Sequence, residues 1–130
     1  MKAFAAFAIG LVAAVTPALA HHSFAVEYDS EKPVTVTGTV TKVEWMNPHA
    51  RFYMDAKDST GKVVMWEIEL GSPNGLLRNG WTRNSLKIGD VTTVAGFLAK
   101  DGTNLASAKA ISLADGRKLF AGSADDGSPK

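Results

Sequence analysis

The chain has 130 residues, with 14 basic and 13 acidic side chains and no cysteine. This length suits a single domain with a small hydrophobic core. The lack of cysteine excludes disulfides, thiol catalysis and thiolate metal sites. The basic residues are scattered rather than clustered, so the sequence does not favour nucleic acid as a partner.

Residues 1–20 have the parts of a secretory signal peptide. Lys2 gives a positive start, a continuous apolar stretch follows, and Ala18 and Ala20 are small residues that signal peptidase accepts. The apolar stretch is shorter than the roughly 20 residues that a membrane span needs. We therefore expect cleavage after Ala20, a periplasmic location, and no transmembrane segment in the mature chain.

The mature chain begins with a polar segment, residues 21–32, which we expect to be an extended N-terminal arm. A β domain over residues 33–121 follows, and its first strand is predicted at residues 34–45. The apolar positions of this strand change parity after Thr41, which is typical of a β-bulge. Gly38 lies near the same point, so the strand is expected to bend there.

Four further segments alternate apolar and polar residues or lie between turn signals. A helix is expected between the third and fourth strands, because Ser72 can cap it, Pro73 suits its first turn and Gly80 can end it. Residues 118–120 are expected to add only a short edge, and residues 122–130 to form a disordered tail. The four predicted strands cover residues 50–56, 63–70, 91–98 and 105–113.

Three strands, a short helix and two more strands follow the element order of the OB-fold. We therefore predict a mainly β protein, an OB-fold-like five-stranded Greek-key barrel with one short helix between strands 3 and 4. The bend in the first strand suits this fold, because that strand contributes to both halves of the barrel. A small sandwich with a different connection order is the alternative.

Four motifs spread over nearly the whole mature chain carry a family resemblance. They are His21-His22-Ser23-Phe24, Trp45-Met46-Asn47-Pro48-His49, Trp66-Glu67-Ile68-Glu69 and the segment 71–81 with its Gly71-Ser72-Pro73-Asn74-Gly75 start. Together they resemble domain-of-unknown-function family 6152, which comprises small exported proteins of Gram-negative bacteria. The resemblance implies an exported, compact β domain. It implies no activity, substrate or catalytic residue.

The histidines form the one candidate metal site. After signal cleavage His21 would carry a free α-amine and an imidazole, which together can chelate a metal, and His22 adds a donor. Copper(II) would bind such nitrogen ligands most strongly, with zinc next. His49, in the loop after the first strand, could join His21 around one copper ion, similar in ligand type to a histidine brace. Alternatively, the arm is merely flexible and His49 forms a hydrogen bond within its turn.

Two carboxylates on the third predicted strand form a weaker candidate. Glu67 and Glu69 share one face and could act as an acid and base pair or as ligands of a hard metal. Strand alternation equally predicts that this face is the solvated one. We favour the solvated face, both for this pair and for Glu44.

The aromatic residues suggest a second kind of binding. Trp66 has the apolar parity of its strand and is expected in the core. Trp45, Tyr53 and Trp81 are candidates for a stacking surface, such as the one with which an OB-fold binds a sugar ring. Alternatively, these rings fill the small barrel.

The sequence contains neither a nucleophile elbow nor a phosphate-binding loop, so no local motif indicates catalysis. We therefore expect a non-enzymatic periplasmic binding module. The first hypothesis is a protein that binds copper or zinc through His21, His22 and His49. The alternative is a module that binds a glycan or a protein partner through aromatic side chains.

Overall fold

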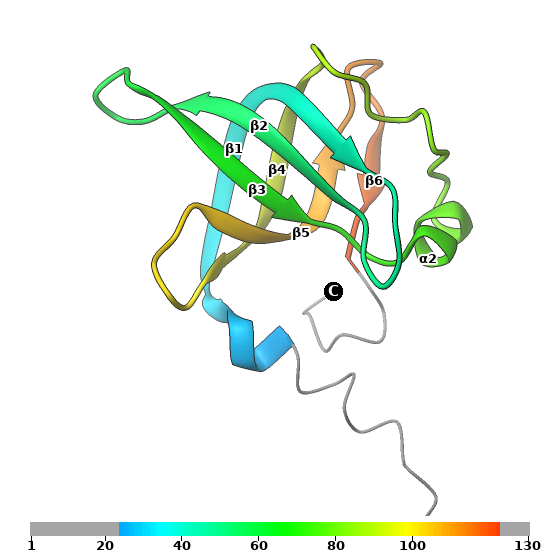
Figure 1. Cartoon of the computed structure of the whole chain (residues 1–130), viewed down its shortest axis with the longest axis horizontal. Helices are drawn as coiled ribbons and strands as arrows, with labels where there is room; N and C mark the ends of the chain where they lie inside the picture. The colour runs from blue at the N-terminus through cyan, green and yellow to red at the C-terminus, as the bar shows by residue number, and fades with distance from the viewer. Residues whose placement is uncertain (1–23, 123–130) are drawn as a thin grey trace, which may run out of the picture.

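The computed structural model describes residues 24–122, so the predicted signal peptide, residues 21–23 of the predicted arm and all but the first residue of the predicted tail lie outside the described residues. The described part is mainly β, as predicted, with six strands instead of five (Figure 1). The elements are a helical turn at residues 24–27, β1 (Tyr28–Glu44), β2 (Arg51–Lys57), β3 (Val63–Glu69), α2 (Pro73–Arg78), β4 (Val91–Ala99), β5 (Leu105–Ser112) and β6 (Lys118–Phe120).

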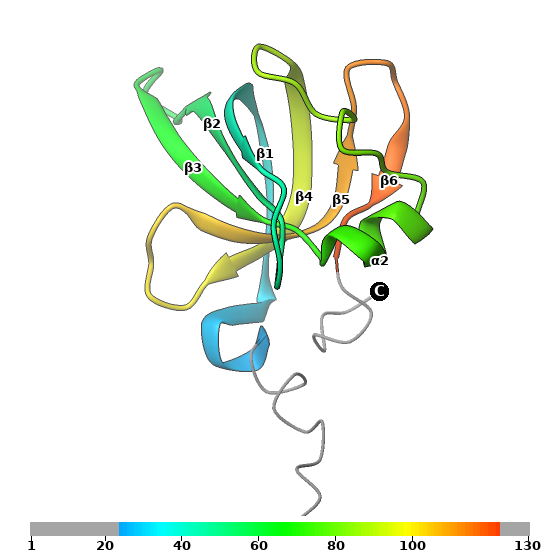
Figure 2. The same cartoon turned by 45° about the vertical axis from the view of Figure 1, so that its right-hand side comes forward.

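The six strands form one sheet in the order β3-β2-β1-β4-β5-β6, in which neighbours are antiparallel. The end of β3 also pairs with the start of β5 in parallel, so the sheet curls until these two strands meet (Figure 2). Strand β6 pairs with β5. It is the sixth strand, at the place where the sequence predicted only a short edge. Helix α2 lies at one end of the curled sheet, beside β6.

Strand β1 starts earlier than its sequence pattern predicts. It begins at Tyr28, which pairs with Ala99 of β4, so residues 28–32 belong to the strand and not to an arm. Most side chains of this first part are exposed and polar, which is why the segment lacks the alternation of a half-buried strand. The prediction of an extended arm is also wrong for residues 24–27, which form a helical turn.

The predicted bulge in β1 is confirmed. The register with β2 passes from the Val40–Met54 pair to the Lys42–Tyr53 pair, which leaves Thr41 as the extra residue. Gly38 lies just before it, where the two strands approach closely. A Cβ atom on Gly38 would lie 2.5 Å from the carbonyl oxygen of Asp55, so only glycine fits without a shift of the backbone.

Helix α2 begins as its sequence predicts. Ser72 caps it by accepting a hydrogen bond from the backbone N–H of Gly75 at 3.2 Å, and Pro73 occupies the first turn. The chain leaves the helix through Gly80, whose φ of 89° suits glycine. Among the described residues, no helix has the length and apolar character that crossing a membrane requires.

The main core lies inside the curled sheet and is covered at one end by α2. Its largest fully buried side chains are Phe52, Met54, Ile68, Leu76, Trp81, Val94, Ile111 and Val40. A second, smaller cluster lies at the base of β1. It consists of Phe24, Tyr28, Phe97 and Ala99, with Leu105 packed against it.

Candidate functional site

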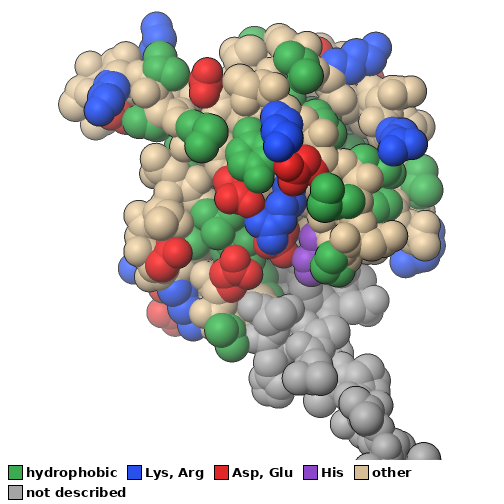
Figure 3. Space-filling view, viewed as in Figure 1, with side chains coloured by type: hydrophobic (Ala, Val, Ile, Leu, Met, Phe, Trp, Pro, Cys, Tyr) green, Lys and Arg blue, Asp and Glu red, His purple; other side chains and the backbone are tan. Residues whose placement is uncertain are grey.

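Charged side chains gather on the outer face of β2 and β3 (Figure 3). The strand register explains this, because it pairs Arg51 with Glu69 and Tyr53 with Glu67. These four residues alternate with core residues along their strands, so their side chains lie on the face opposite the core. The face therefore combines a guanidinium, two carboxylates and a phenol ring.

Glu69 is the centre of this cluster, and only 8% of its surface is exposed. Its carboxylate accepts hydrogen bonds from the hydroxyl of Tyr28 at 2.6 Å and from Arg51 at 3.1 Å. Nδ1 of His49 lies 2.8 Å from its other oxygen. The prediction of a solvated face is therefore wrong for Glu69, because a residue from the start of β1 and a loop residue both reach it.

Glu67 lies closer to solvent than Glu69. Its carboxylate accepts a hydrogen bond from Arg51 at 2.5 Å, and both side chains are about one third exposed, at 31% and 33%. Arg51 thus bridges the two carboxylates of β3. Glu44, on β1, is partly buried and pairs at 2.7 Å with Lys42, so it stays with the surface charges, as predicted.

The cluster shifts the pKa values of its members. Burial alone would raise the pKa of Glu69, but the hydrogen bonds from His49 and Tyr28 and the charge of Arg51 outweigh it and lower the pKa below its ordinary value of 4.5. Burial and the hydrogen bond to Glu69 raise the pKa of Tyr28 well above its ordinary value of 10.0. Tyr28 is therefore a protonated donor and Glu69 an ionised acceptor at neutral pH.

Glu27 adds negative charge beside the cluster. Partial burial raises its pKa, and the charges of Glu69 and Glu67 raise it further, while Arg51 opposes them. Three carboxylates thus act on one another around a single guanidinium.

His49 is the described member of the predicted metal site. It lies in the loop between β1 and β2, after the cis bond between Asn47 and Pro48, and its side chain is mostly buried. Its ring directs Nδ1 at Glu69, and a ring nitrogen that faces an ionised carboxylate carries the proton. His21 and His22 lie outside the described residues. Within residues 24–122, no three His, Cys, Asp or Glu side chains are grouped so that they could hold a metal ion.

The three aromatic residues of the predicted stacking surface differ in their exposure. Trp81 is 2% exposed, and its Nε1 donates to the carbonyl oxygen of Phe120 at 2.9 Å, so it belongs to the core and offers no stacking face. Trp45 and Tyr53 are partly buried. Trp66, expected in the core, is also only partly buried and packs against the core from its margin.

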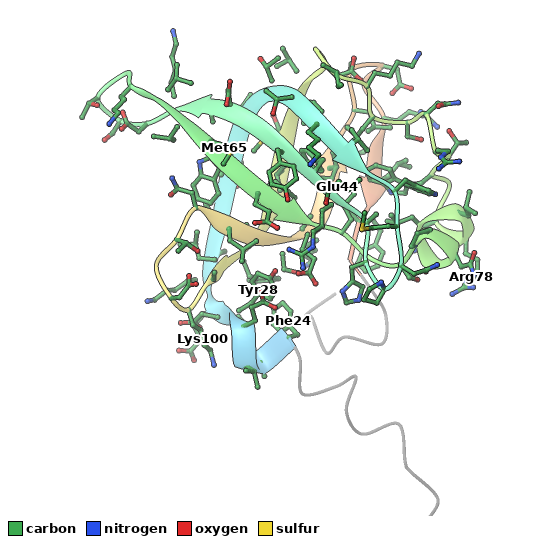
Figure 4. All side chains as sticks on the ribbon, in the orientation of Figure 1. Phe24, Tyr28, Glu44, Met65, Arg78 and Lys100 are labelled. Atoms are coloured by element: carbon green, nitrogen blue, oxygen red, sulfur yellow. The ribbon has the colours of Figure 1, made fainter. Side chains whose placement is uncertain are left out.

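Tyr53 lies on the same outer face as the charged cluster. It shares the outer face with Glu67, and Nζ of Lys42 lies 5.4 Å from the centre of its ring, within the range of a cation–π contact. Met65, two residues before Glu67 on the same face of β3, is 61% exposed (Figure 4). This part of the face could contact a partner through a ring and an apolar side chain.

The helical turn at residues 24–27 is attached to the hairpin of β4 and β5. The backbone N–H of Lys100 donates to the carbonyl of Glu27 at 2.9 Å, and Nζ of Lys100 donates to the carbonyl of Ala25. The rings of Phe24 and Tyr28 lie 5.5 Å apart, and Phe24 meets Phe97 edge to face (Figure 4). The chain at residue 24 is thereby fixed beside the residue that binds Glu69.

Two members of the cluster, Tyr28 and Arg51, were not among the predicted site residues. Strand alternation predicts that Arg51 lies on the outer face of β2. The register between β2 and β3 would also have been needed to place it opposite Glu69. The sequence pattern around Tyr28 indicates an arm, and nothing in it points to Glu69.

Comparisons with known proteins add a family but no role. Residues 8–108 match a family described as a family of unknown function, DUF6152. No curated protein matches the chain.

Proposed function

Because the chain belongs to the DUF6152 family, whose function is unknown, its role has to be argued from its own residues, and we propose that it is a periplasmic copper-binding module. In this proposal the signal peptide is cleaved after Ala20. Copper(II) is then held by the amine and imidazole of His21, by His22 and by His49. Zinc is the alternative metal for the same nitrogen donors.

The observation that carries the proposal is the contact between His49 and Glu69. Histidines that bind metals almost always donate their second ring nitrogen to a carboxylate or carbonyl, which orients the ring and increases its basicity. The 2.8 Å contact between Nδ1 and the buried carboxylate has this geometry. In the proposal, His49 would bind the metal through its other ring nitrogen, Nε2.

The path of the chain supports a role for the N-terminal histidines. Phe24 is packed against Tyr28, which is hydrogen-bonded to Glu69, the residue that contacts His49. His21 precedes Phe24 by three residues, and three residues of extended chain span about 10 Å. Since residues 24–122 contain no complete ligand set, the proposal takes its remaining donors from His21 and His22.

The fold supports a binding site at this place. The pairings run from β1 through β2, β3, β5 and β4 back to β1, and α2 lies between β3 and β4 in the sequence. We infer from this order that the protein is an OB-like barrel. OB-folds bind their ligands on the face of strands 2 and 3 and on the loops beside it, where Arg51, Glu69 and His49 lie.

The test compares copper(II) binding by the mature protein with binding by a synthetic peptide of residues 21–27. The peptide contains the same amine and two imidazoles but lacks His49. Isothermal titration should show that the protein binds copper about 10- to 100-fold more tightly, and that His49→Ala removes this advantage. An extension of Gly-Ser-Gly before His21 should weaken binding as well. Equal affinity of protein and peptide would contradict the proposal.

A second candidate function is the binding of a glycan through the same face. The partly buried ring of Tyr53 and the exposed Met65 lie on that face and favour it. Trp45 is partly buried and packs against the core, and Trp81 takes no part because it is buried. Peptidoglycan fragments are the natural probe for an exported protein. A change of tryptophan fluorescence on their addition that disappears in Trp45→Ala would support this candidate. An unchanged spectrum with these fragments would argue against it.

A further inference from the structure

The first half of β3, residues 63–66, forms a strand edge that lacks a partner strand in the described part of the chain. It belongs to the hairpin of β2 and β3, which projects from the rest of the sheet in both views (Figures 1 and 2). We propose that this free edge pairs with the same edge of a second copy of the protein, in a two-fold dimer. The proposal does not depend on a bound metal.

Strand β3 is paired over its whole length on one side but only in part on the other. With β2 it pairs over residues 63–69, whereas its pairing with β5 begins at Glu67. The N–H of Glu67 donates to the carbonyl of Asn104 at 3.0 Å, on the side of β5. Because backbone groups alternate in direction along a strand, those of Val63 and Met65 point to this side as well. They therefore meet no strand among the described residues.

The free edge lacks the features with which proteins usually protect such an edge. Residues 63–66 are Val-Val-Met-Trp, and the side chains of Val63 and Met65 are 56% and 61% exposed. The first part of β1 also pairs on one side only, because it meets β2 from Thr39 onward, but its residues 29–33 are Asp-Ser-Glu-Lys-Pro. Charges and proline discourage further strand pairing. The sequence thus protects the β1 edge and leaves the β3 edge apolar.

The free edge is complementary to a second copy of itself. When two copies pair antiparallel about Val64, Val63 of each copy meets Met65 of the other, and each such pair exchanges its free backbone hydrogen bonds. The exposed apolar side chains of the outer face then cover one another. A shift toward the end of β3 would place Val63 opposite Glu67, whose backbone already pairs with β5. Pairing about Val64 therefore engages both free residues of each copy.

The residues beside the free edge fit the same register. Trp66 meets Lys62 of the second copy, which combines an indole ring with a cation. Glu67 meets Gly61 of the second copy, which has no side chain, so no like charges face each other. The turn before β3, closed by the 3.0 Å hydrogen bond from Gly61 to Asp58, ends the second strand where β5 begins to pair with β3. The paired segment thus has the length that the free edge offers.

The dimer has a consequence for the charged cluster around Glu69. Two strands that pair within one sheet share its faces, so the outer faces of both copies lie on the same side. Both clusters are then presented to that side, where a large partner could contact them together.

The interface is small, so the dimer should be weak. Strand pairing over residues 61–67 buries less than the roughly 1,200 Å² of total area found in stable complexes. We expect a Kd between about 1 μM and about 1 mM. Sedimentation velocity of the metal-free mature protein should show a shift from monomer to dimer between about 10 μM and about 1 mM. A monomer at both concentrations would overturn the proposal.

Met65→Lys tests whether the free edge is the interface. The change sets a lysine, which protects strand edges, against Val63 of the second copy and should raise the Kd about 10-fold or more. The matched control is Val91→Lys, at an apolar position of β4 that is 60% exposed, and its Kd should equal that of wild type. Equal weakening by both variants would show that net charge controls association and would overturn the proposal.

Val64→Cys tests the register. In the proposed pairing the two Cα atoms at this position lie about 4.5 Å apart, which suits a disulfide, and the chain has no other cysteine. With oxidised glutathione, Val64→Cys should form a covalent dimer faster than Val91→Cys does, although Val91 is the more exposed residue. Crosslinking that is no faster than in Val91→Cys would contradict pairing about Val64.

Discussion

Oε1 of Glu69 lies 2.8 Å from Nδ1 of His49, so a buried carboxylate at the end of β3 orients an imidazole in the loop between β1 and β2. The same carboxylate also accepts hydrogen bonds from Tyr28 and Arg51. It therefore joins three parts of the chain: the start of β1, the loop that follows β1, and the paired strands β2 and β3.

Glu69→Ala should destabilise the protein more than Glu67→Ala does. Removing one partner of a buried charged pair costs about 3 kcal/mol or more, since Tyr28 and His49 lose their acceptor. Glu67 lies closer to solvent and serves Arg51 alone, so its loss should cost about 1 kcal/mol at most. Urea unfolding of the metal-free variants measures both values. Equal losses would show that the burial of Glu69 has no energetic consequence.

The stability of the metal-free protein should depend on pH through Glu69. Its pKa in the folded state lies below the ordinary value of 4.5, so the ionised form is the one that folding favours. This contribution is present above about pH 4.5 and is lost as the pH falls through the folded-state pKa. Unfolding free energies measured from about pH 7 to about pH 3 should therefore fall less steeply for Glu69→Gln than for wild type. Parallel curves would contradict this assignment.

Features that depend on neighbouring residues can be predicted from the sequence, whereas contacts between residues far apart in the chain cannot. The bulge at Thr41 and the start of α2 at Ser72 are local, because parity and capping are properties of neighbouring residues. The burial of Glu69 depends on Tyr28, which is 41 residues away. Strand alternation correctly places Glu69 on the outer face but says nothing about a distant residue that reaches that face.

The case of β1 has the same explanation. Residues 29–32 are polar, and they belong to a strand only because Tyr28 pairs with Ala99 and Pro33 pairs with Phe97 of β4. The contacts within the candidate site could not be predicted from the sequence for the same reason. His49 is recognisable from its residue type, whereas its contact with Glu69 requires the register between β2 and β3 and the course of the loop before them.

Trp81→Phe should lower the stability of the protein without affecting any ligand bound at the outer face. The change leaves the carbonyl of Phe120 without its donor and opens space in the core, which should cost about 1–3 kcal/mol. Thermal unfolding measures the loss. As a control for ligand effects, copper affinity should equal that of wild type. Unchanged thermal stability would contradict the place of Trp81 in the core.

Gly38→Ala should destabilise the sheet near the bulge. Its Cβ would lie 2.5 Å from the carbonyl oxygen of Asp55, so β1 and β2 would have to move apart, at a cost of about 1–3 kcal/mol. Thr39→Ala, at the exposed neighbouring position, is the control and should cost much less. Similar unfolding midpoints for the two variants would show that the strands do not approach closely at Gly38.

The most direct test of the proposed copper site is pulsed electron paramagnetic resonance of the mature protein with one equivalent of copper(II). The spectrum reports the remote nitrogens of coordinated imidazoles, and therefore shows which histidines bind. The proposed site predicts that His49→Ala removes one imidazole contribution and that the Gly-Ser-Gly extension before His21 changes the remaining signals. A spectrum that is identical in wild type and His49→Ala would contradict it.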